Sequence, residues 1–146
     1  MKPETGNAPC VNFVGATIGA GVGPLQGLHG LVADALLSVR LVTATGELIT
    51  VSQTSHPNLF WAIRGAGANF GIITSATYKI FDATNGGQVL NADFSFAGSA
   101  NASLYNLVKS WDNSFPKEAG LVVGAGYSPA TGLVTLPSSI LGGDIF

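Results

Sequence analysis

Charged side chains are scarce in this sequence: they make up 10% of its 146 residues, against about 25% in an average globular chain. The 6 basic and 8 acidic residues give a formal net charge of −2, so the sequence offers no basic face for nucleic acid and no such partner is expected. A surface with so few charges predicts that another domain, a large ligand or a partner chain covers much of it. The length is enough for one domain with a core of its own.

Cysteine and long apolar runs are lacking as well. Cys10 is the single cysteine, which excludes an internal disulfide and leaves the redox compartment open. Every apolar stretch is interrupted well before the roughly 18 residues of a membrane-spanning helix, so no membrane segment is expected. The first residues lack the apolar region of a signal peptide, whereas Asn101-Ala102-Ser103 fits the N-glycosylation sequon and hints at secretion.

Glycine, by contrast, is abundant, with 20 residues, and is concentrated between positions 10 and 30. Because apolar residues are interleaved there, we expect a structured, tightly turning loop with buried apolar anchors rather than a flexible linker. In segment 15–23 (GATIGAGVG), glycines allow close backbone approach, successive N–H groups can form a phosphate nest, and Thr17 offers a hydroxyl. Pro24 and the missing strand–helix frame exclude a dinucleotide fingerprint. The spacing alone leaves structural turns and a ligand cradle equally open.

A hairpin and a helix are predicted next along the chain. Apolar and polar residues alternate over residues 34–52 around a turn at Thr45-Gly46-Glu47, which is typical of a β-hairpin. A short helix opens at residues 55–58, with Pro57 suited to its first turn, and ends at residues 65–67. Phe60 and Trp61 on this helix are expected in the core.

The remaining elements complete the fold prediction. Strands are predicted over residues 70–81, 90–96, 121–123 and 133–136, with a turn at 85–87 and a helix over 101–114. The irregular order of strands and helices, with short turns, predicts an α+β fold that has a mostly antiparallel sheet and flanking helices.

No catalytic or metal-binding constellation is apparent. His29 and His56 are isolated in the sequence: His29 is expected to pack against the glycine-rich loop, and His56 to cap the helix or lie at the surface. Asp34 is interpreted as capping or holding the loop, and Arg64 as pairing with helix C-terminal carbonyls rather than with a cofactor phosphate. No His, Cys or acidic residues have metal-ligand spacing, so no metal is expected.

Several segments taken together resemble the fungal berberine-bridge-enzyme-like oxidases, which belong to the flavin-binding group typified by vanillyl-alcohol oxidase. The resemblance is strong over roughly residues 10–82 and looser beyond them. Its more specific part is the second group of motifs, which ends in Asn-Phe-Gly. The matching segments are residues 15–23 (GATIGAGVG), 25–31 (LQGLHGL), 34–42 (DALLSVRLV), 58–67 (NLFWAIRGAG) and 69–74 (NFGIIT).

The resemblance implies a chain that binds FAD and a fold like the second subdomain of a PCMH-type FAD-binding domain. Residues 10–83 would be the C-terminal part of that domain, and residues 84–146 the incomplete start of a substrate-binding domain. The implied reaction oxidises a small substrate bearing a hydroxyl or amine, with hydride passing to the flavin and on to oxygen. The resemblance also implies a secreted parent family. By match, the cofactor would be lined by Gly15, Thr17, Gly19, Gly23, Gly30 and Val32, and its adenine end would meet the backbone of Gly71 and Ile72.

The sequence also departs from the family pattern. The family commonly tethers FAD through a His in an upstream loop and a Cys; no such loop precedes Cys10, and Ala8 stands where the usual Cys lies. Cys10 matches a second cysteine of many fungal members and is not expected to bond the flavin. Ala16 replaces a His of some relatives, and Tyr127 fits no catalytic motif, so no catalytic residue is assigned.

Three interpretations therefore stay open for the chain. It is the cofactor-binding portion of an oxidase that needs a missing subdomain or partner chain, a truncated relative that cannot hold FAD alone, or a binding module that kept the fold without the chemistry.

Overall fold

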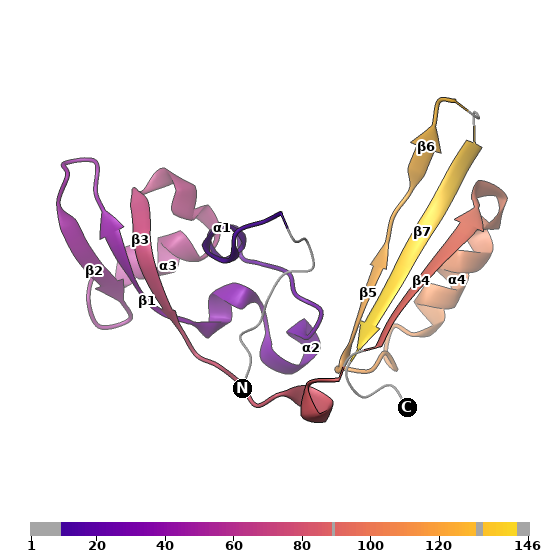
Figure 1. Ribbon diagram of the computed structural model, residues 1–146, viewed down its shortest axis with the longest axis horizontal. Coiled ribbons are helices and arrows are strands. Elements are labelled where there is room, and N and C mark those ends of the chain that lie inside the picture. Colours follow the sequence, from indigo (N-terminus) through magenta and orange to yellow (C-terminus); the bar gives the residue numbers. More distant parts are fainter. Residues whose placement is uncertain (1–9, 89, 131–132, 143–146) are drawn as a thin grey trace. The chain divides into compact units, whose positions relative to one another are not determined.

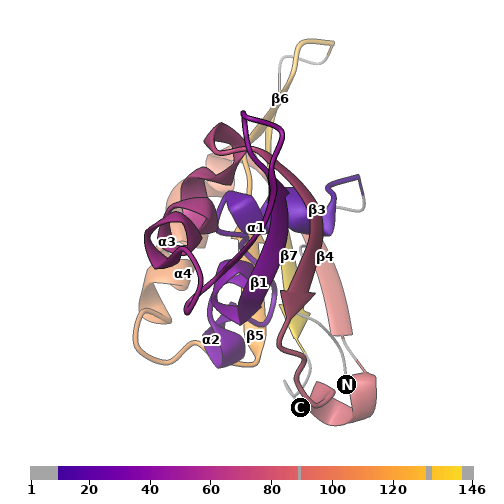
Figure 2. The ribbon, with the colours of Figure 1, turned by 90° about the vertical axis from the view of Figure 1, so that its left-hand side faces the viewer.

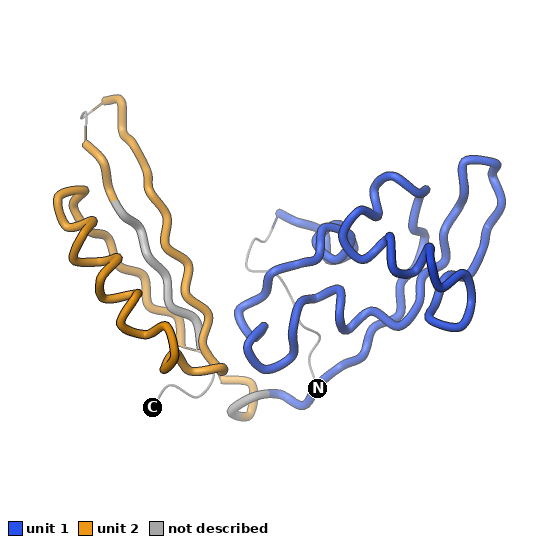
Figure 3. The backbone as a smooth tube through the Cα atoms, turned by 180° about the vertical axis from the view of Figure 1, so that it is seen from behind, with its two compact units in different colours: residues 1–83 blue, residues 84–146 orange. Residues whose placement is uncertain are grey.

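The computed structural model describes residues 10–88, 90–130 and 133–142, and the chain divides into two compact units, Met1–Ala83 and Thr84–Phe146 (Figure 3). Both units combine helices with strands that pair antiparallel, which confirms the predicted α+β class. The functional identities predicted for residues 10–83 and 84–146 stay predictions.

The first unit is built on a three-stranded sheet of order β2-β1-β3. In the register, Val39 of the central strand lies opposite Val51 on one side and Ala76 on the other. Side chains alternate between the two faces of a strand, so Val39 and Leu41 face the core while Arg40 is exposed. The elements, drawn in Figure 1, are α1 (Phe13–Ile18), α2 (Gln26–His29), the 3₁₀ turn η1 (Val32–Ala35), β1 (Leu36–Val42), β2 (Leu48–Ser52), α3 (Pro57–Ala66), η2 (Gly67–Asn69) and β3 (Ile72–Tyr78).

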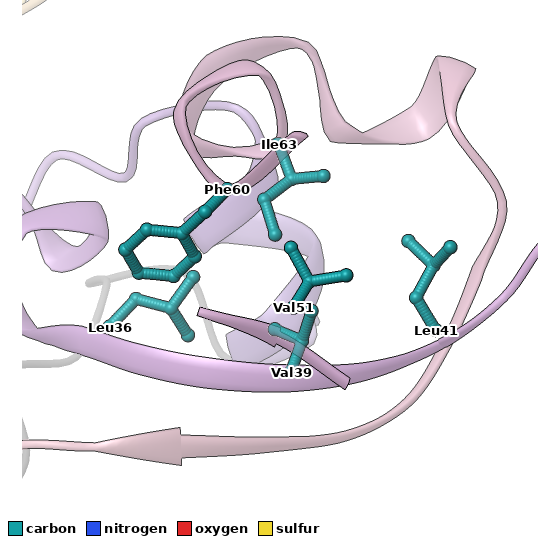
Figure 4. Close-up of a cluster of buried hydrophobic side chains, with 6 residues drawn as sticks. All are labelled: Leu36, Val39, Leu41, Val51, Phe60 and Ile63. Atoms are coloured by element: carbon teal, nitrogen blue, oxygen red, sulfur yellow. The ribbon is translucent and has the colours of Figure 1, made fainter. Parts of the chain in front are cut away.

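The core of this unit lies between the sheet and α3, which covers one face of the sheet (Figures 2 and 4). Phe60 and Ile63 face the sheet together because residues three apart share a helix face. The prediction for Phe60 is confirmed, but that for Trp61 is wrong: its side chain is 75% exposed, since the next residue on a helix points about 100° away. The buried side chains that form this core cluster are Leu36, Val39, Leu41, Val51, Phe60 and Ile63.

The glycine-rich segment between residues 10 and 30 contains two short helices, α1 and α2, rather than loop alone. Asn12 explains the first helix, because its side-chain Oδ1 accepts hydrogen bonds from the N–H groups of Val14 at 2.8 Å and Gly15 at 3.4 Å. The prediction that apolar residues of this segment are buried is also partly wrong. Val22 is 67% exposed, and the residue that is buried in α1 is the polar Thr17.

The second unit is a sheet of order β4-β7-β5 in which β6 also pairs with β7. Leu104 of α4 and Ala119 of β5 are its buried apolar residues in the part of the chain that the structure describes. The predicted strands and helix are found here, with β6 in addition. The elements are η3 (Thr84–Gly87), β4 (Leu90–Ala97), η4 (Gly98–Ala100), α4 (Asn101–Ser110), β5 (Ala119–Val123), β6 (Gly126–Ser128) and β7 (Leu133–Gly142). No helix among the described residues has the length and hydropathy needed to cross a membrane.

Candidate functional site

Residues 19–23, which we call the glycine turn, lead the chain out of α1 and back along η1. Ala20 and Gly21 have φ angles of +78° and +73°, which an L side chain rarely adopts. Their carbonyl oxygens accept hydrogen bonds from the N–H groups of Ala33 at 3.0 Å and Val32 at 2.9 Å. A Cβ on Gly21 would lie 2.7 Å from the Cβ of Val32, so this position requires glycine. The carbonyl side of the turn is thus fixed to η1.

Only some of the backbone N–H groups of the glycine turn donate hydrogen bonds to the described residues. Its first two N–H groups donate to carbonyls of α1 at 3.1 and 3.0 Å. The next three, from Gly21, Val22 and Gly23, have no hydrogen-bond partner within the described ranges 10–88, 90–130 and 133–142, although Gly21 and Gly23 are buried residues. Buried backbone donors in proteins are nearly always paired. The N–H groups of Gly21 and Gly23 therefore mark a place where an acceptor, such as a phosphate or carbonyl oxygen, is favoured, and the N–H of the exposed Val22 lies between them in sequence.

Thr17 was predicted to offer its hydroxyl to a cofactor, yet the structure uses that hydroxyl internally. Its Oγ1 donates to the carbonyl of Phe13 at 2.9 Å and lies 2.8 Å from the hydroxyl of Tyr78. Because a threonine hydroxyl has one proton, Tyr78 is the donor in the second bond. Tyr78 was not among the predicted site residues, and its only signal in the sequence is its place in the predicted strand over residues 70–81. The amide of Gly15 is likewise used, by Asn12. Cofactor contacts through other atoms of Gly15 and Thr17 stay predictions.

Gly30 and Val32 flank a short segment held by an acidic side chain. Oδ2 of Asp34 accepts a hydrogen bond from the N–H of Leu31 at 2.9 Å, which confirms that Asp34 holds the loop. Gly30 has a φ of +79°, and a Cβ there would lie 2.7 Å from the same carboxylate oxygen. Val32 is fully buried and packs behind Gly21. The structure therefore brings Val32 together with the glycine turn.

Gly71 and Ile72 lie at the start of β3, whereas Thr17 contacts Tyr78 at its end. Gly71 has a φ of +144°, and a Cβ there would collide with the carbonyl oxygen of Val42. Ile72 is 71% exposed. Six residue steps along a strand span roughly 20 Å, so no compact ligand reaches both ends of β3. Contact of Gly71 and Ile72 with a cofactor stays a prediction, and it would require an elongated ligand.

Arg64 was predicted to pair with the carbonyls at the end of its helix. Instead its guanidinium lies 5.1 Å from the centroid of the Phe60 ring. The backbone departs from helical geometry at Arg64, with φ −81° and ψ 45°, so the helix end is not arranged for such pairing. Its Nε is buried and has no hydrogen-bond partner among the residues that the structure describes.

Neither histidine belongs to a reactive cluster. The ring of His29 stacks on that of Phe81, with centroids 3.9 Å apart and an interplanar angle of 12°, so it packs beyond the predicted loop. Nδ1 of His56 lies 3.2 Å from the carbonyl oxygen of Thr50, which fits the predicted surface role. Across the described ranges no three His, Cys, Asp or Glu residues are grouped so that they could hold a metal ion. Cys10 is exposed and unpaired with another cysteine.

Curated fungal proteins match most of this chain. It is 62% identical over 135 residues to the FAD-linked oxidoreductase tazL of Aspergillus terreus, a match that covers 92% of this chain and 27% of that protein. It is 56% identical over 127 residues to the FAD-linked oxidoreductase azaL of Aspergillus niger, covering 87% of this chain and 27% of the relative. The chain thus spans about a quarter of the length of the curated relatives it matches. No family model matches the chain.

Solved structures give the same result for the fold. The chain superposes on 6-hydroxy-D-nicotine oxidase from Arthrobacter nicotinovorans with a TM-score of 0.80 and 30% identity, over 97% of this chain and 31% of that one. For BBE-like 1 from Physcomitrella patens the TM-score is 0.74 and the identity 29%, over 94% of this chain and 29% of the other. For a carbohydrate oxidase from Microdochium nivale the values are 0.72 and 26%, over 97% and 30%. The chain is therefore similar in sequence to fungal FAD-linked oxidoreductases and in fold to berberine-bridge-enzyme-like oxidases, of whose length it spans about a quarter to a third.

Proposed function

We propose that this chain forms part of the FAD-binding surface of an oxidoreductase, and that the glycine turn contacts the cofactor through its backbone. The observation that carries the proposal is the set of three adjacent N–H groups, from Gly21 to Gly23, that have no partner among the described residues. FAD has the matching chemistry, since its diphosphate and its flavin carbonyls are hydrogen-bond acceptors. The two positive φ angles at Ala20 and Gly21 hold the backbone in the turned conformation in which these donors follow one another.

The other predicted residues have distinct parts in this proposal. Gly19, Gly23 and Gly30 would leave space for the cofactor to approach the backbone closely. Val32 would support the turn from behind, where it already contacts Gly21. The exposed side chain of Ile72 would offer an apolar surface to the adenine end. FAD is elongated, which suits a contact surface that extends along β3.

When bound, FAD would accept hydride from a small organic substrate bearing a hydroxyl or an amine and pass the electrons to oxygen. This chain's own contribution would be binding and orientation. Both histidines of the sequence are engaged elsewhere, His29 on Phe81 and His56 on Thr50. We therefore propose that the groups that move protons at the substrate come from polypeptide outside this chain, in a missing subdomain or a partner chain.

The direct test is to purify the 146-residue chain, add FAD, desalt it, and record the visible absorbance and the flavin fluorescence. Retained yellow colour with quenched fluorescence is the expected result. A colourless protein contradicts FAD binding by the chain alone and favours the truncated or non-catalytic alternatives.

A matched pair of variants tests the glycine turn itself. Val22 is exposed, and its N–H makes no bond to the described residues, so Val22→Pro removes one proposed donor without breaking an internal hydrogen bond. A hydrogen bond to a charged group contributes about 1.5–3 kcal/mol, so the FAD Kd should rise at least about tenfold. Val22→Ala keeps the donor and should bind FAD like the wild type. Equal weakening by both variants would contradict backbone recognition at this position.

A further inference from the structure

We propose that Tyr78 is a positioning residue for the glycine turn: its hydroxyl holds Thr17 and so fixes the end of α1 from which the turn departs. The consequence for FAD rests on the proposed function above, whereas the consequence for the turn's own order does not. The relevant residues come from sequence positions far apart, α1 near the beginning of the chain and the last residue of β3.

The hydrogen bond at the centre of this proposal is partly buried, and its direction is fixed. Thr17 is 1% exposed and is the buried polar residue of the described chain. Its proton goes to the carbonyl of Phe13, so its oxygen is left to accept the proton of Tyr78. Burial raises the pKa of Tyr78, and the hydrogen bond with Thr17 offsets part of that rise. The phenol therefore keeps its proton at neutral pH and acts as a donor.

Aromatic packing supports the same connection. The rings of Phe13 and Tyr78 meet edge to face, with centroids 4.5 Å apart and an interplanar angle of 63°. Tyr78 also packs against the core cluster and pairs with Leu36 in the sheet. The first and the fifth residue of α1, Phe13 and Thr17, are thus both attached to a side chain that the sheet holds in place.

The glycine turn and the end of α1 have other anchors as well. The carbonyls of Ala20 and Gly21 are bonded to η1, and Ile18 packs against Gly67. Removing the Tyr78 hydroxyl leaves those anchors, the ring contact and the bond from Thr17 to Phe13 intact. The expected effect is therefore local. Helix α1 loses its side-chain hydrogen bond to β3, and the turn that follows α1 becomes less ordered, while the core stays folded.

Hydrogen exchange provides a test that needs no cofactor. In Tyr78→Phe, the amides of Gly19, Ala20, Val32 and Ala33, which close the glycine turn, should exchange about five- to tenfold faster, as expected for one lost hydrogen bond of about 1 kcal/mol. The amides of β1 should be unchanged. Thr17→Val should accelerate exchange at the same amides, whereas Thr17→Ser should retain the wild-type rates. In the double variant Tyr78→Phe with Thr17→Val, these amides should exchange no faster than in either single variant. Tyr105→Phe, at an exposed tyrosine on α4, is the matched control.

Titration with FAD is the second readout. The Kd for FAD should rise about five- to tenfold in Tyr78→Phe and stay unchanged in Tyr105→Phe. If the wild-type chain binds no FAD, the proposed function fails, and the exchange rates still decide the role of Tyr78. Wild-type exchange at the four turn amides in Tyr78→Phe, or an equal acceleration throughout β1, overturns the positioning role.

Discussion

Ile18 and Gly67 are packed so closely that a Cβ at position 67 would lie 2.6 Å from the Cβ of Ile18 and 2.7 Å from its Cγ2. This contact joins α1, in the glycine-rich segment, to η2, in the segment that ends in Asn-Phe-Gly. The two segments that carry the family resemblance are therefore one packed structure, and a glycine is what lets them meet.

Gly67→Ala should lower the free energy of unfolding by about 1–3 kcal/mol, because the added methyl group overpacks the contact with Ile18. Gly15→Ala is the matched control: Gly15 is inside α1, and its nearest neighbour would be the Cβ of Asn12 at an ordinary 3.8 Å. Alanine there should raise stability by roughly 0.5–1 kcal/mol through helix propensity. Urea denaturation measures both, and shifts of the same sign would contradict the packing argument.

Leu41→Ala should destabilise the first unit by about 2–5 kcal/mol, because Leu41 on β1 is fully buried in the core cluster and its truncation leaves a cavity. On the same strand, Leu37 is 52% exposed, so Leu37→Ala should cost less than about 1 kcal/mol. Circular dichroism during urea denaturation gives both values. Comparable losses would mean that Leu41 is not in the core.

Ala20→Gly should stabilise the chain by about 0.5–1 kcal/mol. Ala20 has a φ of +78°, where an L residue is strained by about 1–2 kcal/mol, and glycine relieves this strain at a smaller entropic cost. Ala68→Gly, at an exposed position of η2 without a positive φ, should instead lower stability. A thermal melt of each variant shows the direction, and a lower Tm for Ala20→Gly would contradict the strain.

Stability should fall at alkaline pH in a way that depends on Tyr78. Burial, partly offset by the Thr17 hydrogen bond, raises its folded-state pKa above the ordinary value of 10.0. The folded chain then holds a proton that the unfolded chain releases, so this contribution is complete below pH 10 and is lost as the pH rises through the folded pKa. Tyr78→Phe should show a shallower decline in unfolding free energy above that pH. Parallel curves for wild type and variant would show that Tyr78 does not contribute.

Most of the fold follows from local patterns in the sequence. The hairpin of β1 and β2, helix α3 with Pro57 in its first turn, and the strands on either side of residues 84–87 are all marked by alternation, turn residues or helix periodicity. The short helix α1 was not predicted, because one side chain, that of Asn12, decides it against a glycine-rich background. Trp61 was predicted to lie in the core because its side chain is large and apolar, but its position on α3 leaves it exposed.

The candidate site was less accessible to sequence reasoning. Its glycines could be recognised, but which donors are left over depends on long-range pairing: η1 takes the carbonyls of the turn, and Tyr78 takes the hydroxyl of Thr17. These partners are set by the tertiary structure and leave no periodic signal. The family resemblance indicated the region. The structure shows which hydrogen-bonding groups in it have partners among the described residues and which do not.

The exposed indole of Trp61 on α3 allows the first unit to be followed by tryptophan fluorescence. The sequence has two tryptophans, and the other, Trp111, is in the second unit, partly buried, with its ring 5.8 Å from that of Phe115. In Trp111→Phe, emission would come from Trp61 alone and should be red-shifted and easily quenched by iodide. Polypeptide that covers α3 would shift that emission to the blue, whereas a flavin close to Trp61 would quench it. Each unit thus carries its own fluorophore, and assembly can be followed without an added label.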